Sequence, residues 1–174
     1  YAQTIRAGSV GSKNEDFEKV GTRFHSWFRD NLDKMGLRVN STEDFEGFVN
    51  NDFQFYLEAY KKILDASESI IEGLEHIYYI KQWGIASSLS HPLMLAPLKL
   101  DDSHDTVQQK MNLVARYIET FVVRRSVNFK KFSSSSINYT MNTLVRDIRG
   151  KDIPELRELL TEKLHDMNET WDGM

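Results

Sequence analysis

The chain has 174 residues, of which 40% are hydrophobic and 28% are charged, and this composition is typical of one domain with a buried core. The formal net charge of -4 gives no overall field toward nucleic acid or membranes, and the absence of cysteine excludes disulfides, thiolate metal sites and thiol nucleophiles. No apolar run reaches the roughly 18 to 20 residues that cross a bilayer, and no signal peptide is evident, so we expect a cytoplasmic protein without a membrane partner.

Residues 1–12 contain Gly and Ser breaks without a sustained period and are predicted to be a flexible lead-in. Residues 13–170 are predicted to form a single helical domain. The chain starts at Tyr1 rather than Met and stops at ETWDGM without an obvious helix cap, which indicates a fragment of a larger protein. The first helix is expected from Asn14 to a C-cap at Gly36. Its apolar residues recur at helical spacing: Phe17, Val20, Phe24, Trp27, Phe28 and Leu32.

A second helix is predicted from Ser41, a candidate N-cap followed by acidic residues, to about Ala66. Its apolar face is unusually rich in aromatic residues and offers a surface for a partner. A third helix is predicted over residues 69–81. The apolar face of the second helix consists of Phe45, Phe48, Val49, Phe53, Tyr56, Leu57, Tyr60, Ile63 and Leu64.

Pro92 and Pro97 bracket a short apolar segment that is expected to be one or two buried helical turns, with proline ending what precedes it. The longest helix is predicted over residues 105–128, with acidic N-terminal capping. Residues 133–136 are four serines and are predicted to be a hinge, and two further helices follow over 137–149 and 154–167. No strand period is present, so we predict an all-α fold, an irregular bundle of about six to seven helices.

Candidate chemistry is sparse. Glu72, Glu75 and His76 would lie on one side of a helix and are weak candidates for a metal site, although capping or surface hydrogen bonding explains them as well. The sequence contains neither a phosphate-binding glycine loop nor a Gly-x-Ser-x-Gly turn. We therefore assign no catalytic residue and expect no cofactor in this fragment.

Arg125 lies at helical spacing from Phe121, Ile118 and Val114, which places its stem on an apolar face. Because an unpaired buried guanidinium would cost several kcal/mol, a counter-charge is expected nearby. Asp147 is the preferred partner and Glu75 the second choice. Arg146 and Arg149 complete this predicted polar cluster.

Arg124, Lys130 and Lys131 are candidate nucleic-acid contacts, because phenylalanines at 129 and 132 alternate with the lysines. Basic groups beside aromatic rings suit phosphates and unstacked bases. The alternative is that the cations simply favour a helix C-terminus, with the phenylalanines in the core.

Four segments resemble, together, the helical region of the bacterial domain-of-unknown-function 262 family, which includes the GmrSD modification-dependent restriction enzymes. They are GLEHIYYIKQWG, HPLMLAPL, ARYIETFVVRRSVNF and LVRDIRGKDIPELRELL, and the likeness extends from about Phe45 to Leu164. Its most specific element is FVVRR at residues 121–125. Such proteins carry an Asp-Gly-Gln-Gln-Arg motif in a nucleotide-hydrolysing domain and often a His-Asn-His nuclease centre. Neither motif occurs here, where only Gln108-Gln109-Lys110 is present, so no catalytic residue carries over.

The resemblance implies a non-catalytic scaffold or coupling domain of a nucleotide-dependent DNA restriction protein that acts in phage defence. Its partners would be the nucleotide-binding and nuclease domains of a parent endonuclease, with DNA contact as a further expectation. The alternative is a stand-alone helical protein-interaction module, which includes self-association. A third reading is an enzyme with a site around Glu72, Glu75 and His76.

Overall fold

The computed structural model describes residues 15–82, 84, 87–129 and 134–167. Over this part of the chain the regular structure is helical and contains no strand, which confirms the all-α prediction. The first predicted helix is divided into two, whereas the second continues without interruption through three segments. The elements are α1 (Glu15–Thr22), α2 (Phe24–Asp30), α3 (Thr42–Gly47), the π-helical turn η2 (Phe48–Phe53), α4 (Gln54–Glu68), α5 (Glu75–Gln82), α6 (Ser87–Leu95), α7 (His104–Val127), α8 (Ser134–Asp147) and α9 (Ile153–His165).

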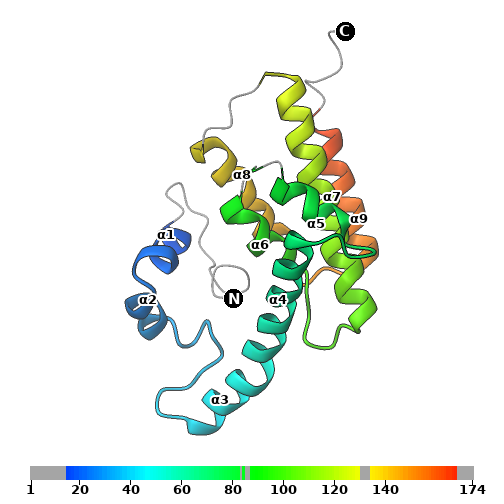
Figure 1. Ribbon diagram of the computed structural model, residues 1–174. Coiled ribbons are helices and arrows are strands. Elements are labelled where there is room, and N and C mark those ends of the chain that lie inside the picture. Colours follow the sequence, from blue (N-terminus) through cyan, green and yellow to red (C-terminus); the bar gives the residue numbers. More distant parts are fainter. Residues whose placement is uncertain (1–14, 83, 85–86, 130–133, 168–174) are drawn as a thin grey trace.

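The long helix α7 is the centre of the fold, and α5, α6 and α9 pack against it (Figure 1). Helix α4 packs on α5 and α6, and α8 packs on α6. The amphipathic period of α7 explains its place, because its apolar stripe reaches neighbours on more than one side. Its buried apolar residues are Val107, Met111, Val114, Ala115, Tyr117, Ile118, Phe121 and Val122.

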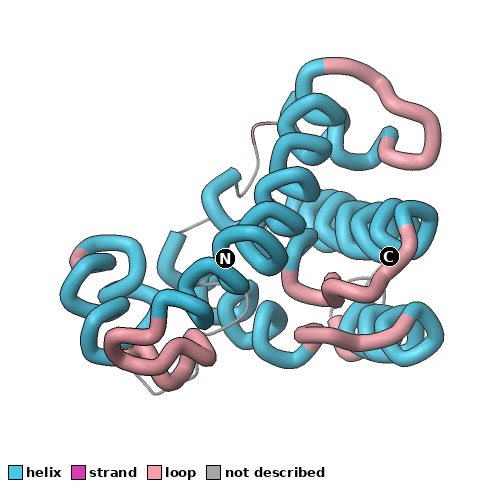
Figure 2. Tube along the Cα trace, turned by 90° about the horizontal axis from the view of Figure 1, so that it is seen from below, coloured by secondary structure: helices cyan, strands magenta, loops and turns pink. Residues whose placement is uncertain are grey.

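Helices α1 and α2 form a smaller unit beside this bundle (Figure 2). It has its own buried cluster of Trp27, Met35 and Leu37, against which Phe48 of η2 packs. The helix predicted from Asn14 to Gly36 is broken at Arg23, whose φ of -138° is not helical, and α2 ends at Asp30. The apolar period continues across a break that the period alone does not reveal.

Three predicted boundaries are wrong. The third helix begins at Glu75 rather than residue 69, because Gly73 adopts a φ of +79° that ends any helical path before it. Helix α6 runs through Pro92 instead of starting there; proline removes one hydrogen bond, and the burial of Leu93 and Met94 compensates for it. Ser134 and the two serines after it belong to α8 and not to a hinge.

The N-cap predicted at Ser41 is confirmed, the cap of α7 is Ser103 rather than an acidic residue, and α9 begins with a cap that was not predicted. The Ser41 hydroxyl accepts from the Asp44 amide at 3.2 Å, and the Ser103 hydroxyl accepts from the Thr106 amide at 3.2 Å. Asp152 and Glu155 form a reciprocal capping box at the start of α9. These local contacts start α3, α7 and α9 where the sequence placed them, within a residue or two.

A buried ion pair ties the segment before α7 to that helix. The Lys110 ammonium is fully buried and donates to both carboxylate oxygens of Asp102, at 2.9 and 2.7 Å, and to the Pro97 carbonyl at 3.0 Å. The Lys99 amide donates to the same carboxylate at 2.8 Å. All three ammonium protons thus have acceptors, which satisfies the condition under which a buried charge is tolerated.

None of the helices in the described part of the chain combines the length and apolar character needed to cross a bilayer.

Candidate functional site

The helix formed by α3, η2 and α4 has two apolar faces, and only one of them is covered. The covered face contains Tyr56, Ala59 and Ile63 and packs into the core. The second face is exposed and is called the apolar face below. Its side chains and their exposed fractions are Phe45 53%, Val49 38%, Phe53 47%, Leu57 44%, Tyr60 36% and Leu64 38%.

The exposed side chains share one side of the helix. They follow one another at spacings of four residues from Phe45 to Leu57 and again from Tyr60 to Leu64. In an α-helix a spacing of four residues drifts sideways by about 40° at each step, and the step of three residues from Leu57 to Tyr60 turns back by about 60°. The row from Phe45 to Leu64 therefore stays on one side of the helix and is about 28 Å long. Its α3 end projects beyond the α5–α9 bundle (Figure 1).

A pocket of about 490 Å³ lies at the N-terminal end of the row. Phe45 belongs to both the pocket and the apolar face, so the two surfaces are continuous. The other lining residues come from α2, the following loop and the start of α3: Phe28, Leu32, Leu37, Arg38, Asn40, Ser41 and Thr42. Four apolar and four polar residues line the pocket, so it offers both apolar contact and hydrogen-bonding groups to one large side chain.

Arg38 and Asp44 hold the wall of this pocket. The Arg38 guanidinium donates to the Asp44 carboxylate through two nitrogens, at 2.8 and 2.9 Å, and the Arg38 amide donates to it at 3.0 Å. These hydrogen bonds hold the pKa of the Asp44 carboxyl well below its usual range. The loop before α3 is therefore fastened to the helix that begins the apolar face.

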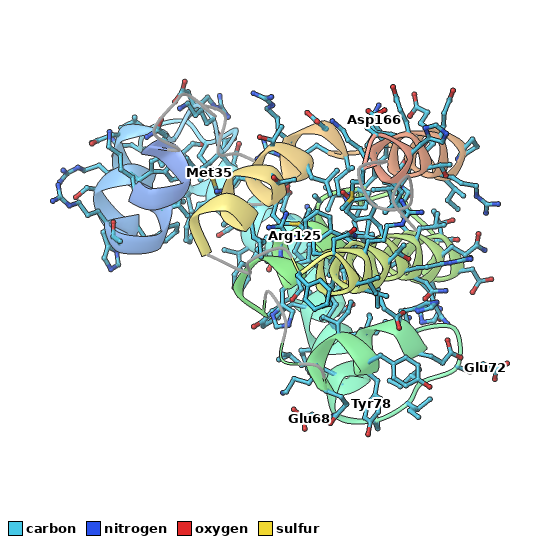
Figure 3. The ribbon with its side chains drawn as sticks, turned by 90° about the horizontal axis from the view of Figure 1, so that it is seen from above. Met35, Glu68, Glu72, Tyr78, Arg125 and Asp166 are labelled. Atoms are coloured by element: carbon cyan, nitrogen blue, oxygen red, sulfur yellow. The ribbon has the colours of Figure 1, made fainter. Side chains whose placement is uncertain are left out.

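One edge of the apolar face is acidic. Glu46, Glu58 and Asp65 each follow a residue of the face by one position, which places all three on the same side, and all are exposed. Lys61 is an exposed basic residue on this edge, and Lys62, one turn after Glu58, contacts His104 of α7 at 2.7 Å. Glu68 lies four residues after Leu64, at the C-terminal end of the apolar row, where it accepts from Lys81 at 2.7 Å, and it points outward in Figure 3. We call Glu46, Glu58 and Asp65 the acidic edge.

The opposite edge is bordered by His91 of α6. Its ring stands edge-on to the Tyr60 ring, with 5.4 Å between centroids. Burial lowers the pKa of His91, and the charge of Lys81 acts in the same direction. The lowered pKa favours the neutral imidazole, and the cation near this border is Lys81, which pairs with Glu68.

The weak metal candidates are not brought together. Helix α5 starts at Glu75, so Glu72 stays in the preceding loop and points away from the bundle (Figure 3). The Glu75 carboxylate accepts from the Gly73 amide at 2.8 Å, and His76 pairs through Nδ1 with Glu119 of α7. Among the described residues there is no group of three or more His, Asp or Glu that could hold a metal ion.

The predicted polar cluster is arranged differently. Asp147 pairs with Lys163 of α9 at 3.3 Å and with Arg146 at 3.8 Å, rather than with Arg125. The Arg125 guanidinium lies over the Phe121 ring at 5.6 Å, and Figure 3 shows its side chain within the helix assembly. Its stem is thus on the apolar side, as its phase predicted. Arg149 is half-buried in the turn after α8.

Arg124 joins two helix ends. Its guanidinium donates to the Leu164 carbonyl in the last turn of α9, which satisfies a carbonyl that has no partner within its own helix. This contact gives Arg124 a structural role, so Arg124 is not a free basic group for nucleic-acid contact. Lys130 and Lys131 lie outside the described residues.

Sequence reasoning missed two features. The buried Lys110 was foreseeable, because it lies three residues after Val107 and four before Val114, within the stripe of α7. The exposure of the apolar face was not foreseeable, because covered and uncovered residues of the second helix follow the same period and were read as one surface.

No family model matches the chain, and neither a curated protein nor a solved structure matches it. The role of each residue therefore has to be inferred from its contacts.

Proposed function

We propose that this chain is a non-catalytic helical module that docks onto another protein through the apolar face of α3, η2 and α4. The observation that carries the proposal is the unbroken row of six large apolar side chains, each more than a third exposed. Isolated exposed apolar residues are normal on a protein surface, but a contiguous row with a polar rim marks an interaction site.

The composition of the row supports protein docking in particular. Three of its six residues are aromatic, and aromatic side chains contribute most to binding energy at protein interfaces. Anchors spaced by three and four residues are the pattern of helix recognition. Covering the row with a partner would be favourable by roughly 25 cal/mol for each Å² of apolar surface removed from water.

A photo-crosslinking experiment tests this function. Benzoylphenylalanine placed at Phe53, on the apolar face, is expected to give a discrete heavier product in cells that express the protein natively. The same probe at Val123, an exposed apolar residue of α7, serves as the matched control and should give none. Equal products at both positions, or none at Phe53, would contradict docking through this face.

The family resemblance supports a narrower form of the proposal, in which the docking partners are the nucleotide-binding and nuclease units of a restriction protein. In this form the chain couples the two units and contributes no catalysis. Contact between DNA and Lys130 or Lys131 remains part of it, whereas Arg124 is already bonded to Leu164. We expect the purified chain neither to hydrolyse GTP nor to cleave modified DNA; turnover of either substrate would count against a purely coupling role.

A further inference from the structure

We infer that the partner on the apolar face is an amphipathic helix with lysine or arginine beside its apolar stripe, and that it places one large side chain in the pocket between α2 and α3. The inference rests on the proposed docking function and specifies the chemistry of the partner.

The shape of the surface favours a helix. The apolar face follows one side of the helix for about 28 Å, which matches about 19 residues of a partner helix lying along it. Helices pack at 8 to 10 Å between axes when side chains of one fill the grooves of the other, and a row of residues at spacings of three and four presents such a ridge. An extended strand would instead need unpaired backbone groups to bond with, and these residues are helical throughout.

The pocket supplies an anchor point at one end of this surface. Its volume of about 490 Å³ is larger than one aromatic side chain needs, and Phe45 makes it continuous with the row. The Arg38–Asp44 contact holds the wall of the pocket in place without a partner. A side chain that enters the pocket therefore loses little free energy to ordering of the site.

Charge selects the kind of helix. Glu46, Glu58 and Asp65 are exposed along one edge, with Lys61 among them, and Lys62, one turn after Glu58, points to His104 of α7. A partner with cations beside its apolar stripe would meet the carboxylates, whereas an acidic partner would be repelled. The same edge argues against a second copy of this chain. In an antiparallel two-fold pairing of the apolar faces, each acidic edge lies against its own equivalent.

Two labelled synthetic peptides of about 18 residues test the inference. Both carry leucines at helical spacing and a terminal Trp, and they differ only in having Lys or Glu at the flanking positions. Fluorescence anisotropy is expected to show the Lys peptide binding at least about tenfold more tightly than the Glu peptide. Glu58→Lys combined with Asp65→Lys is expected to reverse that preference.

Two further variants locate the binding. Leu57→Gln should weaken the Lys peptide by about tenfold, because a large apolar contact is lost, whereas Val123→Gln on α7 should leave binding unchanged. Thr42→Phe narrows the pocket and should remove the advantage of a terminal Trp over Ala in the peptide. Thermal unfolding by circular dichroism confirms that each variant is folded.

The outcomes separate the inference from the proposed function. Equal binding of both peptides, weakened in both cases by Leu57→Gln, overturns the charge selection and leaves docking through the face intact. Lys-peptide binding that Leu57→Gln does not change overturns both. If light scattering shows a dimer that becomes a monomer on Leu57→Gln, the occupant of the apolar face is a second copy of this chain. If the protein binds anionic vesicles in preference to the Lys peptide, the occupant is a lipid surface. Either result overturns the inference.

Discussion

Asp102→Ala is expected to lower the free energy of unfolding by about 3 to 5 kcal/mol. The Lys110 ammonium is fully buried, and removal of the carboxylate leaves it with the Pro97 carbonyl as its remaining described acceptor. The substitution also removes the acceptor of the Lys99 amide. Urea unfolding followed by circular dichroism measures the loss as a lower midpoint.

The double variant provides the control. Lys110→Met keeps an apolar stem of similar length and removes the charge, so Asp102→Ala combined with Lys110→Met should be more stable than Asp102→Ala alone. If the losses of unfolding free energy in the two single variants simply add in the double variant, the ion pair is not what holds the segment before α7 to that helix.

Ile63→Ala and Leu64→Ala are expected to differ widely although the residues are adjacent in α4. Ile63 has no exposed surface and packs in the main core, so its truncation should cost about 2 to 5 kcal/mol through lost burial and a cavity. Leu64 is 38% exposed on the apolar face, and its truncation should cost about 1 kcal/mol or less. Thermal or urea unfolding of the two variants, made in parallel, measures the difference.

This pair also tests the assignment of the two faces. Nearly equal losses would mean that the apolar face is covered within the protein itself, and the docking surface would then be withdrawn. The expected difference supports an α4 that contributes one face to the core and leaves the other for a partner.

Local signals in the sequence predicted the helices whose ends are determined by nearby residues. Ser41, Ser103 and the Asp152–Glu155 pair cap α3, α7 and α9 through contacts within three residues, so the sequence contains all that these starts require. The predicted start of α5 was wrong because a contact between residues distant in the sequence helps to determine it. The Gly73 turn is held by the Glu75 carboxylate and by Gln108 of α7, which donates to the Glu72 carbonyl at 2.7 Å; the second contact spans 36 positions.

The amino-acid sequence by itself determined an all-α fold, the central helix α7 and the apolar character of the second helix, because periodicity and caps are local properties. Only the tertiary structure decided which side of that helix is covered. Helices α5 and α6 pack on one of its faces and leave the other exposed, a choice that the shared helical period does not encode. Phe45 continues the exposed face into the pocket, and this continuity supports the proposed docking surface.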